Sequence, residues 1–253
     1  MADNPTDTTE AMPAPSIQDL ATLTEASYDT TNMTPTTNYT RLDQYSNPEI
    51  STYKHNEKPQ YVISHRGTNL ADAKSARKDV RADLNIALGN KEADVLHKRR
   101  TKQTEEIVKA IKKQEPNSDI YLTGHSLGGS TASNAMASSK VVRDNVKELH
   151  TFNSGSSALQ KPPSVSPEVR AELMQKSTHH RVKGDMISEH VEKNLIGKQK
   201  IYESKKKPSI ADHVLKLATP LLKRTFIGKA VGYGVRKVLD TLRAHSISNF
   251  TRK

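Results

Sequence analysis

Short apolar runs rich in β-branched residues alternate along this chain with longer polar and amphipathic stretches. Four runs have the length and composition of buried strands: residues 60–64, 120–123, 148–152 and 179–183. A basic segment at residues 96–114 places Ile107, Val108 and Ile111 on one face, as in an amphipathic helix. Because strands that alternate with helices favour parallel pairing, the pattern predicts an α/β fold with a mostly parallel central sheet flanked by helices.

The two ends of the chain differ in composition from this middle part. Residues 1–15 consist largely of Thr, Pro, Ala, Asp and Asn, so we expect a disordered N-terminal tail. Ser16 followed by Asp19 is a typical helix start. We therefore expect a single domain over residues 16–253, with a basic helical region at about 205–243.

Composition limits the class of protein. The chain has 253 residues, enough for one substantial core, and only 4% aromatics with no Trp, so aliphatic side chains must fill that core. Cysteine is absent, which excludes disulfides and leaves the redox compartment undetermined. No apolar run approaches the length of a membrane span, and the first residues lack the pattern of a classical signal peptide. We thus expect no transmembrane segment.

Positive charge is concentrated in the last quarter of the chain. Residues 194–253 contain 14 Lys or Arg and three Asp or Glu, which accounts for the whole net charge of +11. This region could dock on an anionic membrane, where each basic residue contributes about 1 kcal/mol. A nucleic acid or an acidic protein is a less favoured partner. The simplest alternative is a helix packed on the sheet with a solvated basic face.

The most informative motif is Gly124-His125-Ser126-Leu127-Gly128, which directly follows the apolar run 120–123. A strand that enters a G-x-S-x-G turn is the nucleophile elbow of α/β-hydrolases, in which a strained backbone exposes the serine hydroxyl. The small residues at 129–137 suit a helix packed tightly beneath the elbow. Ser126 is therefore the candidate nucleophile.

A serine nucleophile needs a base, and the base needs an acid that orients it. Asp185 is the acid best placed, since it follows the predicted strand 179–183 and so would lie at the carboxyl edge of the sheet. Of the later histidines, His190 is too close in sequence to Asp185 to turn back. His213 is in the middle of a predicted helix, so we favour His245, which follows a long helix in a polar turn.

The reaction also needs N–H groups that stabilise an oxyanion. The residue after the nucleophile, Leu127, supplies one. The second comes from the loop after an earlier strand, where Arg66-Gly67-Thr68 makes the amide of Thr68 the candidate.

From about Ser16 to Phe250 the chain resembles the class 3 (fungal-type) lipase family of the α/β-hydrolase superfamily. The matching pieces, in order, are His65-Arg66-Gly67-Thr68, Ala82-Asp83-Leu84, Val95-Leu96-His97-Lys98, Thr123-Gly124-His125-Ser126-Leu127-Gly128-Gly129, Thr151-Phe152-Asn153-Ser154-Gly155, Arg181-Val182 with Asp185, and His245 with Phe250.

This resemblance implies hydrolysis of ester bonds in acylglycerols or phospholipids, with no cofactor. The implied catalytic triad is Ser126, Asp185 and His245, with an acyl-enzyme intermediate. The oxyanion hole would comprise Thr68 and Leu127, and Asp83 matches a position that supports the oxyanion residue by hydrogen bonding.

The resemblance also places a lid at about residues 69–80. That segment has one Leu and no aromatic residue, which favours an enzyme with little dependence on a lipid interface. The competing hypothesis is a catalytically silent hydrolase fold that docks through its basic C-terminal region. We expect no metal site, since His179 and His180 lack spaced partners and are expected at a solvated strand end.

Overall fold

The computed structural model describes residues 13–29, 38–67, 92–155, 165–185, 195–203 and 246–251. The predicted disordered tail lies almost wholly outside these residues, and the predicted lid and basic region lie wholly outside them. The domain boundaries therefore stay predictions.

A seven-stranded sheet with the strands in sequence order forms the centre of the molecule. Its strands are β1 (Tyr39–Arg41), β2 (Ile50–His55), β3 (Gln60–His65), β4 (Asp119–His125), β5 (Val146–Phe152), β6 (Ser177–Val182) and β7 (Lys198–Tyr202). Strands β1 to β3 pair antiparallel, and β3 to β7 pair parallel. The carboxyl ends of β3 to β7 consequently share one edge of the sheet.

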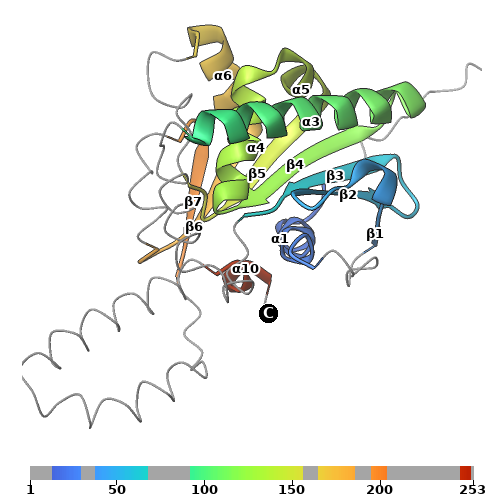
Figure 1. Ribbon diagram of the computed structural model, residues 1–253. Helices are drawn as coiled ribbons and strands as arrows, with labels where there is room; N and C mark the ends of the chain where they lie inside the picture. Colours follow the sequence, from blue (N-terminus) through green and yellow to red (C-terminus); the bar gives the residue numbers. More distant parts are fainter. Residues whose placement is uncertain are drawn as a thin grey trace, which may run out of the picture.

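Helices cover both faces of this sheet (Figure 1). They are α1 (Ile17–Ala26), α3 (Glu92–Gln114), α4 (Leu127–Ser138), α5 (Lys140–Asn145), α6 (Pro167–Lys176) and α10 (Ser248–Thr251), with a short 3₁₀ turn η1 (Asp43–Tyr45). Helices α3 to α6 lie on one face, and α1 with α10 lies on the other (Figure 1). This mostly parallel sheet between two helical layers is an α/β-hydrolase fold, which confirms the predicted fold class.

Each helical layer packs on its own hydrophobic core. The larger core joins the apolar stripe of α3, including the fully buried Val108 and Ile111, to the small residues of α4 and to the sheet. The second core joins Leu20 and Leu23 of α1 to Phe250 of α10 across the opposite face. Burial of these stripes explains why the period-3.6 pattern of residues 96–114 predicts α3 correctly.

The start of α1 is confirmed in detail. Ser16 and Asp19 form a capping box, in which the Ser16 hydroxyl accepts from the Asp19 N–H at 3.0 Å. None of the described helices has the length and apolar character needed to cross a membrane.

The prediction for His179 and His180 is wrong. Both side chains are buried in β6, with 1% and 0% exposure, rather than solvated at a strand end. The cause is β7, which the sequence pattern does not reveal because Lys198, Lys200 and Gln199 give it a polar composition. Pairing with β7 places β6 inside the sheet rather than at its edge.

Candidate active site

Strand β4 runs directly into a strained turn at Ser126. This serine has φ 55° and ψ −125°, a backbone conformation that residues with a side chain rarely adopt. Helix α4 begins at the next residue, and the Ser126 side chain does not cap it. Unlike the fully buried strand before it, Ser126 is partly exposed. These are the properties expected of a nucleophile elbow.

Two glycines make this turn possible. A Cβ atom added to Gly124 would lie 2.5 Å from the carbonyl carbon of Gly128. One added to Gly128 would lie 2.0 Å from the backbone oxygen of His65, the last residue of β3. Since real Cβ atoms do not approach backbone this closely, the G-x-S-x-G spacing is a steric requirement of the turn.

The turn after β3 lies against the elbow. A Cβ atom on Gly67 would be 2.6 Å from the carbonyl oxygen of His125 and 3.2 Å from Cβ of Ser126. Gly67 thus lies directly against the candidate nucleophile, as an oxyanion loop requires. The proposed donor, Thr68, follows immediately but lies outside the described residues.

Tyr28, which the sequence analysis did not single out, joins these two segments. Its hydroxyl oxygen accepts the Gly67 N–H at 3.0 Å and lies 2.7 Å from Nδ1 of His125. Because the Tyr28 hydroxyl accepts from Gly67, its own hydrogen is left to donate to Nδ1 of His125. The ring proton of neutral His125 is then on Nε2. Burial of the hydroxyl raises the pKa of Tyr28 well above its usual range. Tyr28 follows α1 in a polar stretch, where no local pattern indicates its role.

The acid candidate lies at the same edge of the sheet. Asp185 is fully buried at the end of a turn in which its N–H donates to the Val182 carbonyl at 3.1 Å. Gly184 provides the positive φ of 84° in that turn. Because β5 alone separates β4 from β6, the axes of the strands that carry Ser126 and Asp185 are about 10 Å apart.

Asn153 connects the nucleophile and acid strands. It is fully buried with a positive φ of 43°, and its side-chain oxygen accepts the Val182 N–H at 2.9 Å. Its own N–H donates to the His180 carbonyl at 2.8 Å. Two residues later, the Gly155 N–H donates to the Ser126 carbonyl at 3.0 Å. The loop after β5 therefore contacts both strand ends.

The segment after the predicted base is described, although His245 itself is not. Ser246 precedes α10, whose Phe250 ring lies 4.9 Å from Phe152 and 5.4 Å from Tyr202 between ring centroids. Residues 246–251 thus pack beside the carboxyl ends of β5 and β7. The alternative base His213, and also Asp83, lie outside the described residues.

A second group missed by the sequence analysis lies beneath the elbow. His65 is fully buried between two hydroxyls, with Nδ1 2.9 Å from Oγ1 of Thr131 and Nε2 2.9 Å from Oγ1 of Thr104. Burial lowers the pKa of His65 well below its usual value, so it is neutral. Nearby, Arg100 of α3 has a side chain that is 5% exposed.

A signal for Arg100 exists in the sequence. Residues 100, 104, 107 and 111 share one helical face, so Arg100 lies on the apolar stripe rather than on the solvated side of α3.

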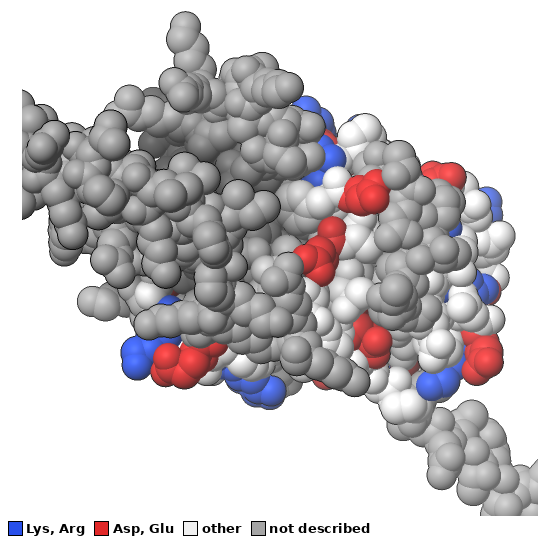
Figure 2. Space-filling view, turned by 90° about the horizontal axis from the view of Figure 1, so that it is seen from below, with Lys and Arg blue, Asp and Glu red and all other residues white. Residues whose placement is uncertain are grey.

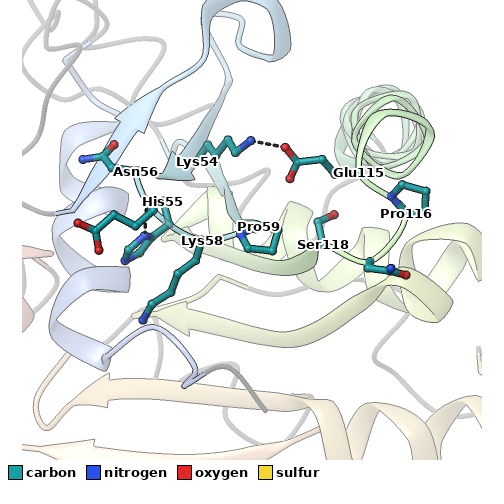
Figure 3. A pocket seen from close by; sticks show the side chains of 10 residues that line it. Lys54, His55, Asn56, Lys58, Pro59, Glu115, Pro116 and Ser118 are labelled. Atoms are coloured by element: carbon teal, nitrogen blue, oxygen red, sulfur yellow. Dashed lines mark hydrogen bonds and ion pairs between the residues drawn. The ribbon is translucent and has the colours of Figure 1, made fainter. Parts of the chain in front are cut away.

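The described residues also form a pocket that does not include Ser126. The pocket in Figure 3 lies at the amino ends of β3 and β4, opposite the elbow, and the ion pair of Lys54 with Glu115 spans it. On the face shown in Figure 2, the described acidic side chains are scattered among uncharged ones, and the described Lys and Arg lie mainly toward the periphery. Within the described part of the chain, no group of three His, Asp or Glu is arranged to hold a metal ion.

Comparison with protein families gives a match over most of the chain. Residues 11–231 match the sequence model of a family described as phospholipase-like, with a Tle-like phospholipase domain. Comparison with curated protein sequences gave no match.

Solved structures with a similar fold include the MDLA mutant of Penicillium cyclopium, 15% identical, with a TM-score of 0.47 over 78% of this chain and 81% of that one. Lip2 lipase of Yarrowia lipolytica is also 15% identical, with a TM-score of 0.45 over 75% and 78% of the two chains. The Rhizomucor miehei lipase propeptide complex, again at 15% identity, has a TM-score of 0.38 over 68% and 61%.

Proposed function

Because this chain belongs to the Tle-like phospholipase domain family, we propose that it is a serine hydrolase that cleaves carboxylic ester bonds of lipids, with phospholipids as the first substrate class to test. The family supports lipid ester hydrolysis as the general activity. The observation that carries the specific mechanism is the backbone of Ser126, a strained, partly exposed serine between a buried strand and a helix. Such strain is retained where the surrounding structure and the chemistry require it.

In the proposed mechanism, Ser126 attacks the ester carbonyl while His245 removes the hydroxyl proton. Asp185 holds the imidazole in the tautomer that can accept this proton and stabilises the imidazolium that forms. His245 then donates the proton to the leaving alcohol, which produces an acyl-enzyme. Water attacks the acyl-enzyme with the same histidine as base, and the fatty acid leaves.

Negative charge develops on the carbonyl oxygen during both steps. We assign its stabilisation to the N–H groups of Leu127 and Thr68, with Asp83 supporting the second donor. Leu127 is the first residue of α4, so its N–H has no acceptor within the helix and the helix dipole favours an anion there. The Gly67 N–H is already donated to Tyr28, which leaves the next amide as the donor from this loop.

Position in the chain and packing favour His245 over His213 as the base. The residue after His245 belongs to a segment that packs beside the ends of β5 and β7, next to the strand that precedes Asp185. His245→Gln and His213→Gln variants test this choice. Only the first should lose turnover, and the opposite result would assign the base to His213.

The main experiment uses phospholipid vesicles, some of them anionic, with product analysis by mass spectrometry. We expect free fatty acid and lysophospholipid. Ser126→Ala should lower turnover by on the order of 10⁶-fold. Ser133→Ala is the matched control, because it removes a hydroxyl of the adjacent helix α4, and this Ser133 hydroxyl is buried without a hydrogen-bond partner among the described residues. This control should retain full activity.

Other outcomes would contradict the proposal. Diacylglycerol or phosphatidic acid as the product would mean that a phosphate ester is cleaved instead. An inactive wild type on vesicles and on p-nitrophenyl esters of graded chain length would favour the catalytically silent role. Activity on p-nitrophenyl esters alone would retain the mechanism and reject phospholipids.

A further inference from the structure

The peptide group between Arg66 and Gly67 is held at both of its polar atoms. Its carbonyl oxygen, on Arg66, accepts a hydrogen bond of 2.7 Å from Nη1 of Arg100. Its N–H, on Gly67, donates to the hydroxyl of Tyr28 at 3.0 Å. The two partners come from α3 and from the end of α1, on opposite faces of the sheet (Figure 1).

Arg100 also contacts the elbow helix. Its Nη1 donates to Oγ1 of Thr131 in α4 at 3.2 Å, and that hydroxyl donates to the Gly128 carbonyl at 3.0 Å. On its other side, Nη2 lies 3.4 Å from a carboxylate oxygen of Glu49. One guanidinium therefore links the turn after β3, Thr131 of α4 and the residue before β2.

A buried guanidinium in this place is costly for stability. The Arg100 side chain is 5% exposed, and Glu49, its one carboxylate partner among the described residues, also pairs with Arg99 at 2.5 Å. Its Nε is buried without a hydrogen-bond partner among the described residues. Since a buried ion pair commonly contributes no more stability than apolar residues of similar volume in its place, a gain in geometry accounts for Arg100 better than a gain in stability.

We propose that Arg100 is a positioning residue for the oxyanion hole. By fixing the Arg66 carbonyl, while Tyr28 fixes the Gly67 N–H, it sets the plane of the peptide that precedes the proposed Thr68 donor. The direction of the next N–H is set by this fixed plane together with φ and ψ of Gly67, which packs directly against the backbone of His125 and the side chain of Ser126. The inference rests on the proposed function, in which that amide stabilises the oxyanion.

Kinetic measurements on Arg100→Met and Arg100→Lys test the proposal. A donor misplaced by about 1 Å costs roughly 10²-fold, so kcat of Arg100→Met should fall by about that factor with KM little changed. Arg100→Lys keeps a charge and a donor and should recover part of kcat. A fall in stability with unchanged kcat would overturn the proposal, as would an increase in KM alone.

Arg143 provides a matched control. It is also a nearly buried arginine, and its Nη1 donates to the carbonyls of Met136 and Ala137 at 3.1 and 2.8 Å, at the end of α4 remote from Ser126. Arg143→Met should lose stability and keep kcat. Equal losses of kcat in Arg100→Met and Arg143→Met would show that Arg100 acts only through general stability.

Amide hydrogen exchange of Gly67 separates this inference from the proposed function. Exchange at this amide should be faster in Arg100→Met than in the wild type and in Arg143→Met, whether or not the protein hydrolyses lipids. An inactive wild type with this exchange pattern would reject the hydrolase and keep the positioning role. An active wild type whose Gly67 exchange is unchanged in Arg100→Met would keep the hydrolase and reject the positioning role. If Arg100→Met does not fold, Arg100→Lys replaces it in both the exchange and the kinetic comparisons.

Discussion

Lowering the pH from 7 to 5 should destabilise the folded chain, and about 4 kcal/mol of this loss should come from two adjacent histidines of β6 that are buried in their neutral form. His179 has a fixed tautomer: Nε2 lies 3.1 Å from the Ile196 carbonyl and must donate to it, so Nδ1 accepts from the Thr151 hydroxyl at 2.7 Å. Protonation would place a second N–H opposite that hydroxyl in a site without water access.

His180 is the middle of a hydrogen-bonded chain across three strands. Its Nε2 lies 3.1 Å from Nδ1 of His150, and its Nδ1 lies 2.9 Å from the Tyr202 hydroxyl. His150 in turn places Nε2 2.8 Å from a carboxylate oxygen of Glu148. In the consistent arrangement the Tyr202 hydroxyl donates to His180, His180 donates to His150 and His150 donates to this carboxylate, with both imidazoles neutral.

The magnitude follows from the pKa values. Burial lowers the pKa of His179 to about 4, and burial with the neighbouring His150 and Lys200 lowers the pKa of His180 to about 3. An unfolded histidine has a pKa of about 6.5, so below that pH the unfolded state binds protons that the folded state refuses. The free energy of unfolding therefore decreases as the pH is lowered, by about 2 kcal/mol for each of the two histidines between pH 7 and pH 5.

Urea unfolding followed by circular dichroism at pH 7, 6 and 5 tests this prediction. His179→Gln and His180→Gln should each reduce the loss between pH 7 and 5 by about 2 kcal/mol. Leu149→Val, a change in the same core, is the control: it should lower stability by a similar amount at every pH. If both glutamine variants keep the full pH dependence of the wild type, these histidines are not its source.

Two further substitutions test the elbow and its neighbour. Tyr28→Phe should cost about 1–3 kcal/mol of stability and at least tenfold in kcat, because the Gly67 N–H and His125 Nδ1 lose their partner; urea unfolding and esterase assays measure both. Gly128→Ala should abolish turnover and cost about 1–3 kcal/mol or more, since its Cβ would meet the His65 carbonyl oxygen at 2.0 Å. Wild-type turnover in Gly128→Ala would contradict the close approach.

The sequence predicts the elbow well because the elbow is local. Gly124, Ser126 and Gly128 lie within five residues, and their spacing follows from the sterics of one turn. Asp185 is placed by the equally local rule that a parallel strand ends at the shared edge, although its pairing with a histidine stays a prediction. The family match confirms the lipase-like resemblance at the level of a phospholipase-like domain.

The residues that the sequence does not predict act across long distances in the chain. Tyr28 contacts His125, 97 positions away, and Arg100 contacts Arg66, 34 positions away. Tyr28 follows a helix in a polar stretch, where no local pattern separates it from a solvated side chain. The position of Arg100 on the apolar stripe of α3 indicates that it is buried, but not which groups it contacts. Their roles follow only from the packing of α1 and α3 on opposite faces of one sheet.

Strain at two strand ends connects the fold with the chemistry. Among the described residues, Ser126 and Asn153 are the non-glycine residues with positive φ, and they follow neighbouring strands. In each case the N–H of the strained residue donates to a carbonyl of the next strand, at Phe152 and at His180 respectively. The sheet thus continues its hydrogen bonding past the strand end and holds a conformation that costs on the order of 1–3 kcal/mol.

Such a cost is not needed to connect a strand with a helix, since a glycine in place of Ser126 would make the same turn without strain. A serine there is explained if its hydroxyl must project from the edge where β3 to β6 end. The turn at Gly67, the elbow and the turn at Asp185 all lie at that edge. The same parallel pairing that builds the core therefore brings the proposed nucleophile, oxyanion loop and acid to one edge of the sheet.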